Sequence, residues 1–433
     1  MIKNQLTPPR HNTVSTYLPL RSKDKHYKFC WDTVLGYFTH VLYDKSLVTK
    51  TIDDFKKLCK IQFESKLDEP EFWLVLEQMY FEEGQVFNIS PELLMFKAVK
   101  GEIDTNSQNL GEMYAGLLNG FTVPSSAESQ LNFLEKEIKT EFDSFYVTGK
   151  NNSKINVITP YLPFLTHYFQ QDLLLLSKRP HYFISNFNLI IRLYGFLFVT
   201  QMALNIKDWA NNEPKNKPCF FILDNEKASD ERLQVKNYGY SQLHHYLEYL
   251  FPYLAMNEAL QEKGQTKPLW MLATYLKEND HYQEEFFEFA NDFKSKRNLT
   301  KEIDARTSVA MLAELLELSH QQFLYPHGTP DKIKINETVV KGILGNICEP
   351  FIQHRGRAGQ VLTFNQDYIV LLTNLAIGEK EKLRLHELVK AFEARGVFFD
   401  EQSQQSLIDF YERMGNVERM SDSGDAVYVK KTV

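Results

Sequence analysis

Apolar residues recur every three or four positions over most of the chain, and this spacing predicts helices. One such segment covers residues 131–145, and another covers residues 307–322. In each, the apolar side chains fall on one face of an α-helix and polar residues occupy the other. A short apolar run at residues 219–223 is the clearest strand candidate outside the C-terminal region. We therefore predict a mainly α protein with a multi-helical body.

The most apolar stretch, residues 188–205, predicts a buried core helix. Arg192 interrupts it, and the uncharged part that follows, residues 193–206, is too short to span a bilayer. The N-terminus has no apolar region of the kind that precedes a signal cleavage site. The four cysteines are too far apart in the sequence for a CxxC pair and fit a reducing compartment. We expect a cytoplasmic protein that does not enter a membrane.

The C-terminal region carries an ordered series of short elements. Turn residues separate them: Gly378, Gly396 and Gly415 follow predicted helices, and Asp400 is a plausible N-cap of the third helix. The predicted series is a helix ending at Gly378, a strand at 383–385, a helix ending at Gly396, a helix ending at Gly415, and strands at 416–420 and 426–430. This order predicts a winged helix-turn-helix domain.

These patterns divide the chain into three predicted domains. Residues 1–150 form an N-terminal helical region with a basic arm, and residues 151–360 form a central helical region with one short strand. Residues 361–433 form the winged-helix domain. The loop at 354–360 then acts as a hinge before the last domain.

Charge is distributed unevenly over these parts. The 433 residues carry 49 Lys and Arg against 56 Asp and Glu, a formal charge of −7, which excludes a protein that coats nucleic acid by bulk charge. The first thirty residues, however, carry a net charge of +5, and residues 367–433 carry −3. Any contact with DNA must therefore come from a local basic patch.

The acidity of the predicted winged helix favours a protein partner over DNA, because phosphate is bound by Lys and Arg. The candidate partner-binding residues are Asp400 at the start of the third helix and Ser421, Asp422, Ser423, Gly424 and Asp425 at the wing tip. An alternative remains open, since Gln402, Gln404 and Gln405 could read base edges, as in a DNA-binding transcriptional regulator.

Three basic clusters could follow a phosphate backbone. The candidate nucleic-acid-binding residues are Lys294, Lys296, Arg297 and Lys301, then Arg355 and Arg357, and then Arg21, Lys23 and Lys25 of the basic arm. A charge run is usually just a solvated face, and for 354–360 a plain solvated hinge explains the two arginines equally simply.

No sequence motif identifies an enzyme. Residues 354–360 resemble the arginine-rich motif of superfamily-2 helicases, but the chain has no GxxxxGK(S/T) loop to bind ATP. Glu137 and Lys139 have the ExK spacing of some nucleases, yet their alternating-charge helix predicts a solvated face. Asp224 and Glu226 leave a metal-dependent nuclease as a weaker alternative. We expect no catalytic residue, metal or cofactor.

Several segments resemble the DptG family, a component of bacterial DNA phosphorothioation-dependent restriction systems. They are 395–400 (RGVFFD), 421–429 (SDSGDAVYV), Glu349-Pro350-Phe351 leading into Arg355-Gly356-Arg357, and 222–229 (ILDNEKAS). The resemblance implies a subunit that works with DptF and DptH, which would carry the NTPase and helicase-like functions. Together they would attack double-stranded DNA that lacks the phosphorothioate mark.

Overall fold

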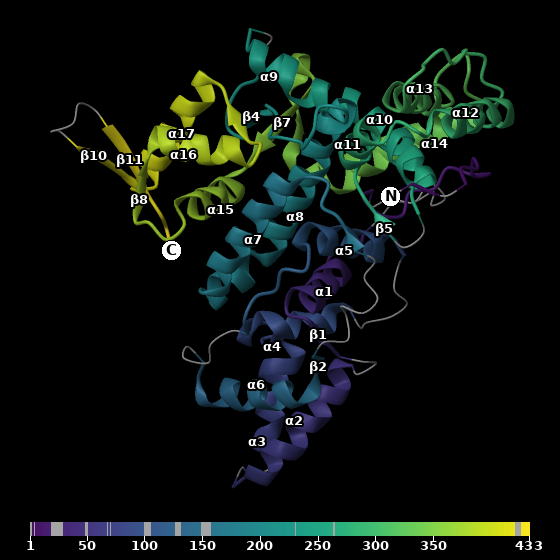
Figure 1. Ribbon diagram of the computed structural model, residues 1–433. Coiled ribbons are helices and arrows are strands. Elements are labelled where there is room, and N and C mark those ends of the chain that lie inside the picture. Colours follow the sequence, from purple (N-terminus) through teal and green to yellow (C-terminus); the bar gives the residue numbers. More distant parts are fainter. Residues whose placement is uncertain are drawn as a thin grey trace. The chain divides into compact units, whose positions relative to one another are not determined.

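The computed structural model describes residues 2–3, 5–18, 29–47, 51–66, 68–69, 71–98, 105–125, 131–148, 157–229, 231–262, 265–420 and 426–433 (Figure 1). Helices make up 63% of the structure and strands 8%, so the prediction of a mainly α protein is confirmed.

The chain divides into two compact units. Unit 1 comprises Met1–Tyr27, Asn156–Tyr168 and Arg192–Val433, and unit 2 comprises Lys28–Ile155 and Phe169–Ile191. This division differs from the predicted domains, because strand pairing joins the central region to the C-terminal region within unit 1.

Unit 2 is built from short helices and one pair of two-residue strands. Its elements are α1 (Trp31–Leu42), β1 (Lys45–Ser46), α2 (Ile52–Lys66), α3 (Phe72–Leu76), the π-helix η1 (Glu77–Glu82), α4 (Val86–Ile89), the 3-10 helix η2 (Pro91–Ala98), α5 (Thr105–Leu118), α6 (Phe133–Phe145) and β2 (Val147–Thr148).

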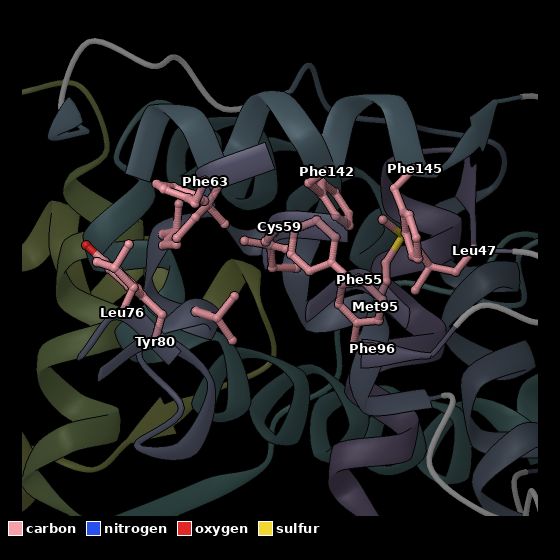
Figure 2. Close-up of a cluster of buried hydrophobic side chains, with 14 of the residues drawn as sticks. Leu47, Phe55, Cys59, Phe63, Leu76, Tyr80, Met95, Phe96, Phe142 and Phe145 are labelled. Carbon is pink, nitrogen blue, oxygen red and sulfur yellow. The ribbon is translucent and has the colours of Figure 1, made fainter. Parts of the chain in front are cut away.

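A cluster of aromatic rings forms the core of α2, η2 and α6 (Figure 2). Phe55 of α2 stacks on Phe96 of η2 with ring centroids 5.3 Å apart, and it meets Phe142 of α6 edge-on at 5.8 Å. All three rings are at most 1% exposed. Edge-on and offset rings are the favoured arrangements, so these contacts add to the hydrophobic stabilisation of unit 2.

Helices α7 (Pro163–Ser177) and α8 (Pro180–Asn205) contribute residues to both units. The long helix at Pro180–Asp208 could cross a membrane by length and composition alone, but 89% of its apolar window is buried. The interpretation of the apolar stretch as a buried core helix is therefore confirmed.

Unit 1 holds the remaining elements. They are β3 (Val157–Ile158), the 3-10 helix η4 (Ile206–Asp208), β4 (Phe220–Leu223), α9 (Leu233–Tyr238), α10 (Tyr240–Leu260), β5 (Gln265–Thr266), α11 (Leu269–Glu278), α12 (Gln283–Arg297), α13 (Ser308–Gln321), α14 (Pro330–Asn346), the 3-10 helix η5 (Glu349–Phe351), β6 (Ile352–His354), the 3-10 helix η6 (Gly356–Ala358), β7 (Gln360–Phe364), α15 (Gln366–Ile377), β8 (Lys382–Arg384), α16 (Leu385–Ala394), β9 (Phe398–Phe399), α17 (Glu401–Arg413), β10 (Val417–Met420) and β11 (Ala426–Lys430).

Unit 1 contains two larger sheets and the two-stranded parallel pair β3–β5. The first has the strand order β6-β7-β4-β9, in which β4 runs parallel to both β7 and β9. The second is antiparallel, with the order β10-β11-β8. Residues 354–360, predicted as a hinge, instead form the tight connection of the β6–β7 hairpin, so this prediction was wrong. The backbone N–H of Arg355 donates to the carbonyl of Gly359 across it at 2.7 Å.

The predicted helices and the strand at 219–223 are confirmed as α6, α13 and β4. The predicted C-terminal elements are all present, but the structure adds a strand that was not predicted, β9, between the second and third helices. Asn132 and Glu135 form a capping box at the start of α6, and Asp400 caps α17 by accepting a hydrogen bond from Ser403 N–H at 2.9 Å.

The three glycines predicted to end the C-terminal helices, Gly378, Gly396 and Gly415, all have positive φ, of +63°, +89° and +73° respectively. Residues 421–425, the predicted wing tip, lie outside the described residues.

Gly396 is required by space as well as by backbone conformation. A Cβ at this position would lie 2.4 Å from the side-chain nitrogen of Gln201. That side chain is held in place, because its amide donates to the carbonyl of Lys217 and accepts from the N–H of Lys217. We expect Gly396→Ala to lower the free energy of unfolding by about 2–3 kcal/mol, from left-handed strain plus overpacking.

Urea denaturation of the full chain measures this loss. Gly415→Ala is the matched control, because Gly415 has φ +73° but a Cβ there would meet nothing within 4 Å. The control should lose only the strain, about 1 kcal/mol. Equal losses at the two positions would contradict a packing role for Gly396.

Candidate functional site

The candidate site lies where the carboxyl end of β4 meets the start of α17, both in unit 1. Phe220 pairs with Phe398 and Phe221 with Phe399, so β9 ends beside the middle of β4 and α17 begins there. The turn after β4 starts at Asp224 and leads to α9. The carboxyl ends of parallel strands are a common location for binding sites in sheets of this type.

A buried guanidinium joins these elements. The Nη1 of Arg232 lies 2.7 Å from Oε2 of Glu226, and its Nε donates to Oδ2 of Asp400 at 2.8 Å. Its Nη2 also pairs with Asp400 and donates to the hydroxyl of Ser403 at 2.6 Å. The side chains of Arg232, Glu226 and Asp400 are only 6%, 4% and 11% exposed. We call Arg232, Glu226, Asp400 and Ser403 the Arg232 network.

The remaining acceptors of the network are also satisfied. Oε1 of Glu226 accepts a hydrogen bond from the backbone N–H of Leu223 at 2.8 Å. Oε2 of Glu226, which also pairs with Arg232, lies 3.0 Å from the Ser403 hydroxyl. Burial alone would raise the pKa of Asp400, but the hydrogen bonds from Arg232 and from Ser403 N–H outweigh burial and hold this pKa below its usual range. Asp400 therefore stays ionised as both ion-pair partner and helix cap.

Asp400 was predicted to meet a partner protein, and its surroundings argue against that role. Both of its carboxylate oxygens already accept hydrogen bonds, from Arg232 and from the first turn of α17. The sequence contained no signal for this, because Arg232 lies 168 residues earlier. The other predicted partner-binding residues, Ser421, Asp422, Ser423, Gly424 and Asp425, lie outside the described residues.

A surface hollow of about 750 Å³ opens beside the Arg232 network. Glu226 is its buried lining residue, and most of the others are exposed polar residues. The lining residues are Asn225, Glu226, Lys227, Gln402, Ser406, Asp409, Glu412 and Arg413. A hollow with mainly polar and charged walls suits a hydrophilic segment of another protein better than an apolar ligand.

The glutamines at the start of α17 are largely engaged within the chain. The Gln404 amide donates to the carbonyl of Phe399 at 2.9 Å, and the Gln405 amide donates to Asp409 at 3.1 Å. Gln402 lines the hollow. A recognition helix reads bases with its N-terminal residues, but here that end is joined to β4 by Arg232.

The predicted nucleic-acid-binding residues fall on separate elements. Lys294, Lys296 and Arg297 lie in the last turn of α12, and Lys301 follows in the next segment. Arg355 donates to the backbone carbonyl of Asp224 from the β6–β7 connection, whereas Arg357 is exposed there.

The predicted basic arm is only partly described. Arg21, Lys23 and Lys25 lie outside the described residues. The residues before them pack on unit 1: the Tyr17 hydroxyl donates to the carbonyl of Thr159 at 2.6 Å, and Ser15 N–H donates to the carboxylate of Glu258 at 2.9 Å.

The geometry argues against the nuclease alternative, because the carboxylate of Glu226, one of its two candidate metal ligands, already pairs with Arg232 and Ser403. Within the part of the chain that the structure describes, no three His, Cys, Asp or Glu side chains are grouped to hold a metal ion. Lys139 of the ExK pair was predicted on a solvated face, but it is 2% exposed and lies 2.5 Å from Asp143, so that prediction was wrong.

Comparisons with known proteins identify no relative. No family model matches the chain, and none of the curated proteins matches it.

Proposed function

We propose that this protein is a non-enzymatic adaptor of the winged-helix class, whose C-terminal domain binds a protein. More specifically, we propose that it is a DptG-like subunit of a cytoplasmic phosphorothioation-dependent restriction complex. In this role it works with DptF and DptH on double-stranded DNA that lacks the mark.

One observation carries the proposal. Three segments that resemble the DptG family are far apart in the sequence, yet they belong to one four-stranded sheet. Residues 222–229 include the end of β4, 395–400 include β9, and 349–357 include β6. Arg232 and Arg355 link the turn after β4 to Asp400 and to the β6–β7 connection. We expect segments that resemble one family to lie around the same sheet when the chain and that family share a structural unit.

The winged-helix assignment rests on the order α15, β8, α16, β9, α17, β10 and β11, with β8 added to the β10–β11 hairpin. The strand β9, between the second and third helices, belongs to the other sheet. Arg232 ties Asp400 and Ser403, at the start of α17, to the turn after β4. Glu401 and Gln402 stay exposed there, and the net negative charge of residues 367–433 favours protein binding over contact with phosphate.

The hollow beside α17 has exposed acids and bases on its wall: Asp409, Glu412, Lys227 and Arg413. Because Glu412 is paired with Arg419, we assign the hollow to a polar segment of the partner that places a basic group against Asp409.

Co-purification with DptF and DptH tests the proposal. We expect a stable complex, and we expect Asp409→Arg to weaken it at least about tenfold, because a reversed charge at an interface repels a basic partner. Glu288→Arg, at an exposed position on α12, is the matched control and should leave the affinity unchanged. A stable monomer that binds neither subunit would overturn the proposal.

A further inference from the structure

The helix α3 of unit 2, which the π-helix η1 continues without a break, buries one of its faces (Figure 1). Trp73, Leu76 and Tyr80 lie on this face and are at most 4% exposed. Their spacing of three and four residues places them in one stripe, and all three belong to the aromatic core of unit 2 (Figure 2). These buried side chains fix the orientation of the helix, so its opposite face is turned outward.

The outward face of α3 is also apolar. Phe72, Leu74 and Val75 are 42%, 64% and 55% exposed. Single apolar residues scattered over a surface need no explanation, but these three fall within one helical turn. A surface helix ordinarily carries polar side chains on its outward face, and a helix that is apolar on both faces is ordinarily buried on both. The outward face of α3 therefore has the composition of an interface.

Acidic side chains surround this apolar turn. Residues 64–83 contain seven acidic residues and one lysine, and that lysine is already paired with a glutamate of α6. Asp68, Glu69 and Glu71 are exposed just before the apolar turn, and none of the three forms an ion pair within the described residues. Glu71 lies three and four residues before the two most exposed apolar side chains, so it shares their face of the helix. These carboxylates are available to the cations of a partner.

The charges select among the occupants that an apolar face accepts. A second copy of the chain, related by a twofold axis, would set the same acids against each other, and like charges at an interface repel. Anionic lipid and nucleic acid are repelled for the same reason. A helix with apolar residues on one side and Lys or Arg beside them complements both properties of the surface, because it covers the apolar turn and neutralises the acids.

We propose that the α3 face, defined as Glu69, Glu71, Phe72, Leu74 and Val75, docks a basic amphipathic helix of a partner protein. Apolar side chains of that helix cover the exposed apolar turn, and its lysines or arginines pair with Glu69 and Glu71. The α3 face belongs to unit 2, whereas the hollow beside α17 belongs to unit 1, so the inference does not rest on the proposed function.

Fluorescence anisotropy of the full chain tests the inference, with a labelled leucine–lysine peptide patterned as an amphipathic helix as the probe. The wild type should bind this peptide. Leu74→Gln with Val75→Gln should weaken binding at least about tenfold, because less apolar surface is then buried in the complex. Both positions are exposed, so the fold should survive, and circular dichroism checks this.

A charge exchange tests the acidic part of the α3 face. Glu69→Lys with Glu71→Lys should weaken binding of the leucine–lysine peptide and should favour the matching leucine–glutamate peptide instead. Preference of the wild type for the leucine–glutamate peptide would contradict the inference.

Leu174→Gln is the matched control, since Leu174 is a leucine of unit 2 on α7 that is 43% exposed. It should leave the affinity for the leucine–lysine peptide unchanged. Absence of binding by the wild type, or an equal loss in Leu174→Gln and in the Leu74 and Val75 double variant, would overturn the inference.

Other occupants of the α3 face would give different results. A wild-type dimer in sedimentation that the Leu74 and Val75 double variant converts to a monomer would overturn the inference and indicate a second copy. Binding to phosphatidylcholine vesicles that the same variant abolishes would overturn it and indicate a membrane surface.

The inference and the proposed function can fail separately. Asp409→Arg, in unit 1, should leave binding of the leucine–lysine peptide unchanged. Capture of DptF and DptH by a chain that binds no peptide would overturn the docking inference alone. Peptide binding that depends on the α3 face, in a chain that captures neither subunit, would support the docking inference and overturn the adaptor role alone.

Discussion

Replacing Arg232 by methionine is expected to lower the free energy of unfolding of unit 1 by about 3–5 kcal/mol. The substitution keeps most of the side-chain volume but leaves Glu226 and Asp400 buried without their cation. Removing one partner of a buried ion pair is this costly because the remaining charge is desolvated and unpaired. The loss should appear as faster hydrogen exchange in peptides from α17 and from the turn after β4, the two segments that Arg232 joins.

The effect should depend on pH with a defined sign. In the wild type, the pKa of Asp400 lies below its usual range, so its contribution is present above about pH 4 and is lost as the pH falls through the folded-state value. In Arg232→Met the two buried carboxyls should instead take up protons readily. The difference in stability between wild type and variant should therefore shrink from pH 7 towards pH 4.

Two further variants separate the charge effect from simple loss of packing. Arg306→Met, at an exposed position of unit 1, should change stability by less than about 0.5 kcal/mol. Adding Glu226→Gln and Asp400→Asn to Arg232→Met should cost less than the sum of the separate changes, because the unpaired charges are then gone. Strict additivity would contradict a coupled network.

Replacing Glu92 by glutamine is expected to lower the stability of unit 2 by a similar amount, about 3–5 kcal/mol. Glu92 is fully buried and lies 3.5 Å from the ammonium of Lys45 and 3.7 Å from that of Lys139. These lysine side chains are only 5% and 2% exposed. Glutamine keeps the shape of the side chain but leaves two buried ammonium groups without the carboxylate between them.

Glu92, Lys45 and Lys139 form a buried charge cluster, and other groups orient it. Lys45 donates to the Ser125 hydroxyl at 2.8 Å and lies 4.1 Å from the centre of the Tyr146 ring. Burial would raise the pKa of Glu92, but Lys139, the Ser90 hydroxyl and Lys45 outweigh burial and lower it. The stabilisation by Glu92 is therefore present above about pH 4.3 and is lost as the pH falls further.

Hydrogen exchange of peptides from η2 and α6 measures the Glu92→Gln loss within unit 2. Glu64→Gln is the matched control, because Glu64 forms an exposed pair with Lys60 worth at most about 0.5 kcal/mol. Replacing all three buried groups together, as Lys45→Met, Glu92→Leu and Lys139→Met, should restore much of the stability. A Glu92→Gln loss no larger than that of Glu64→Gln would show that the cluster is not electrostatically coupled.

Local patterns in the sequence predict much of the fold. Helix periodicity locates α6 and α13, and three glycines mark the ends of the C-terminal helices, because only a residue without Cβ adopts positive φ at low cost. Asp400 is recognisable as a helix cap from its position before α17. These features depend on residues within one or two turns of each other.

The pairing of β4 with β7 and β9 was not predictable in this way. The paired residues are more than a hundred positions apart, and β9 has only two residues, too few for a periodic signal. The hairpin at 354–360 was misread as a hinge for a related reason, since glycine and arginine indicate a turn but not the strands that flank it.

Charge was the property that the sequence described least well. Asp400 and Lys139 are charged residues on amphipathic helices, and local spacing predicts solvent exposure for both. Tertiary contacts instead bury each against a counter-charge from another segment, Arg232 and Glu92. Whether a charge is buried depends on the electrostatic energy of a pair, which does not exist until both members are brought together.

The sequence by itself therefore determined the helical class, most element ends and the excess of acid over base, because these depend on local spacing and composition. Only the tertiary structure decided which charges remain available to a partner. It joins the start of α17 to β4 and opens a polar hollow beside it. Such pairings depend on chain topology, and local sequence does not encode topology.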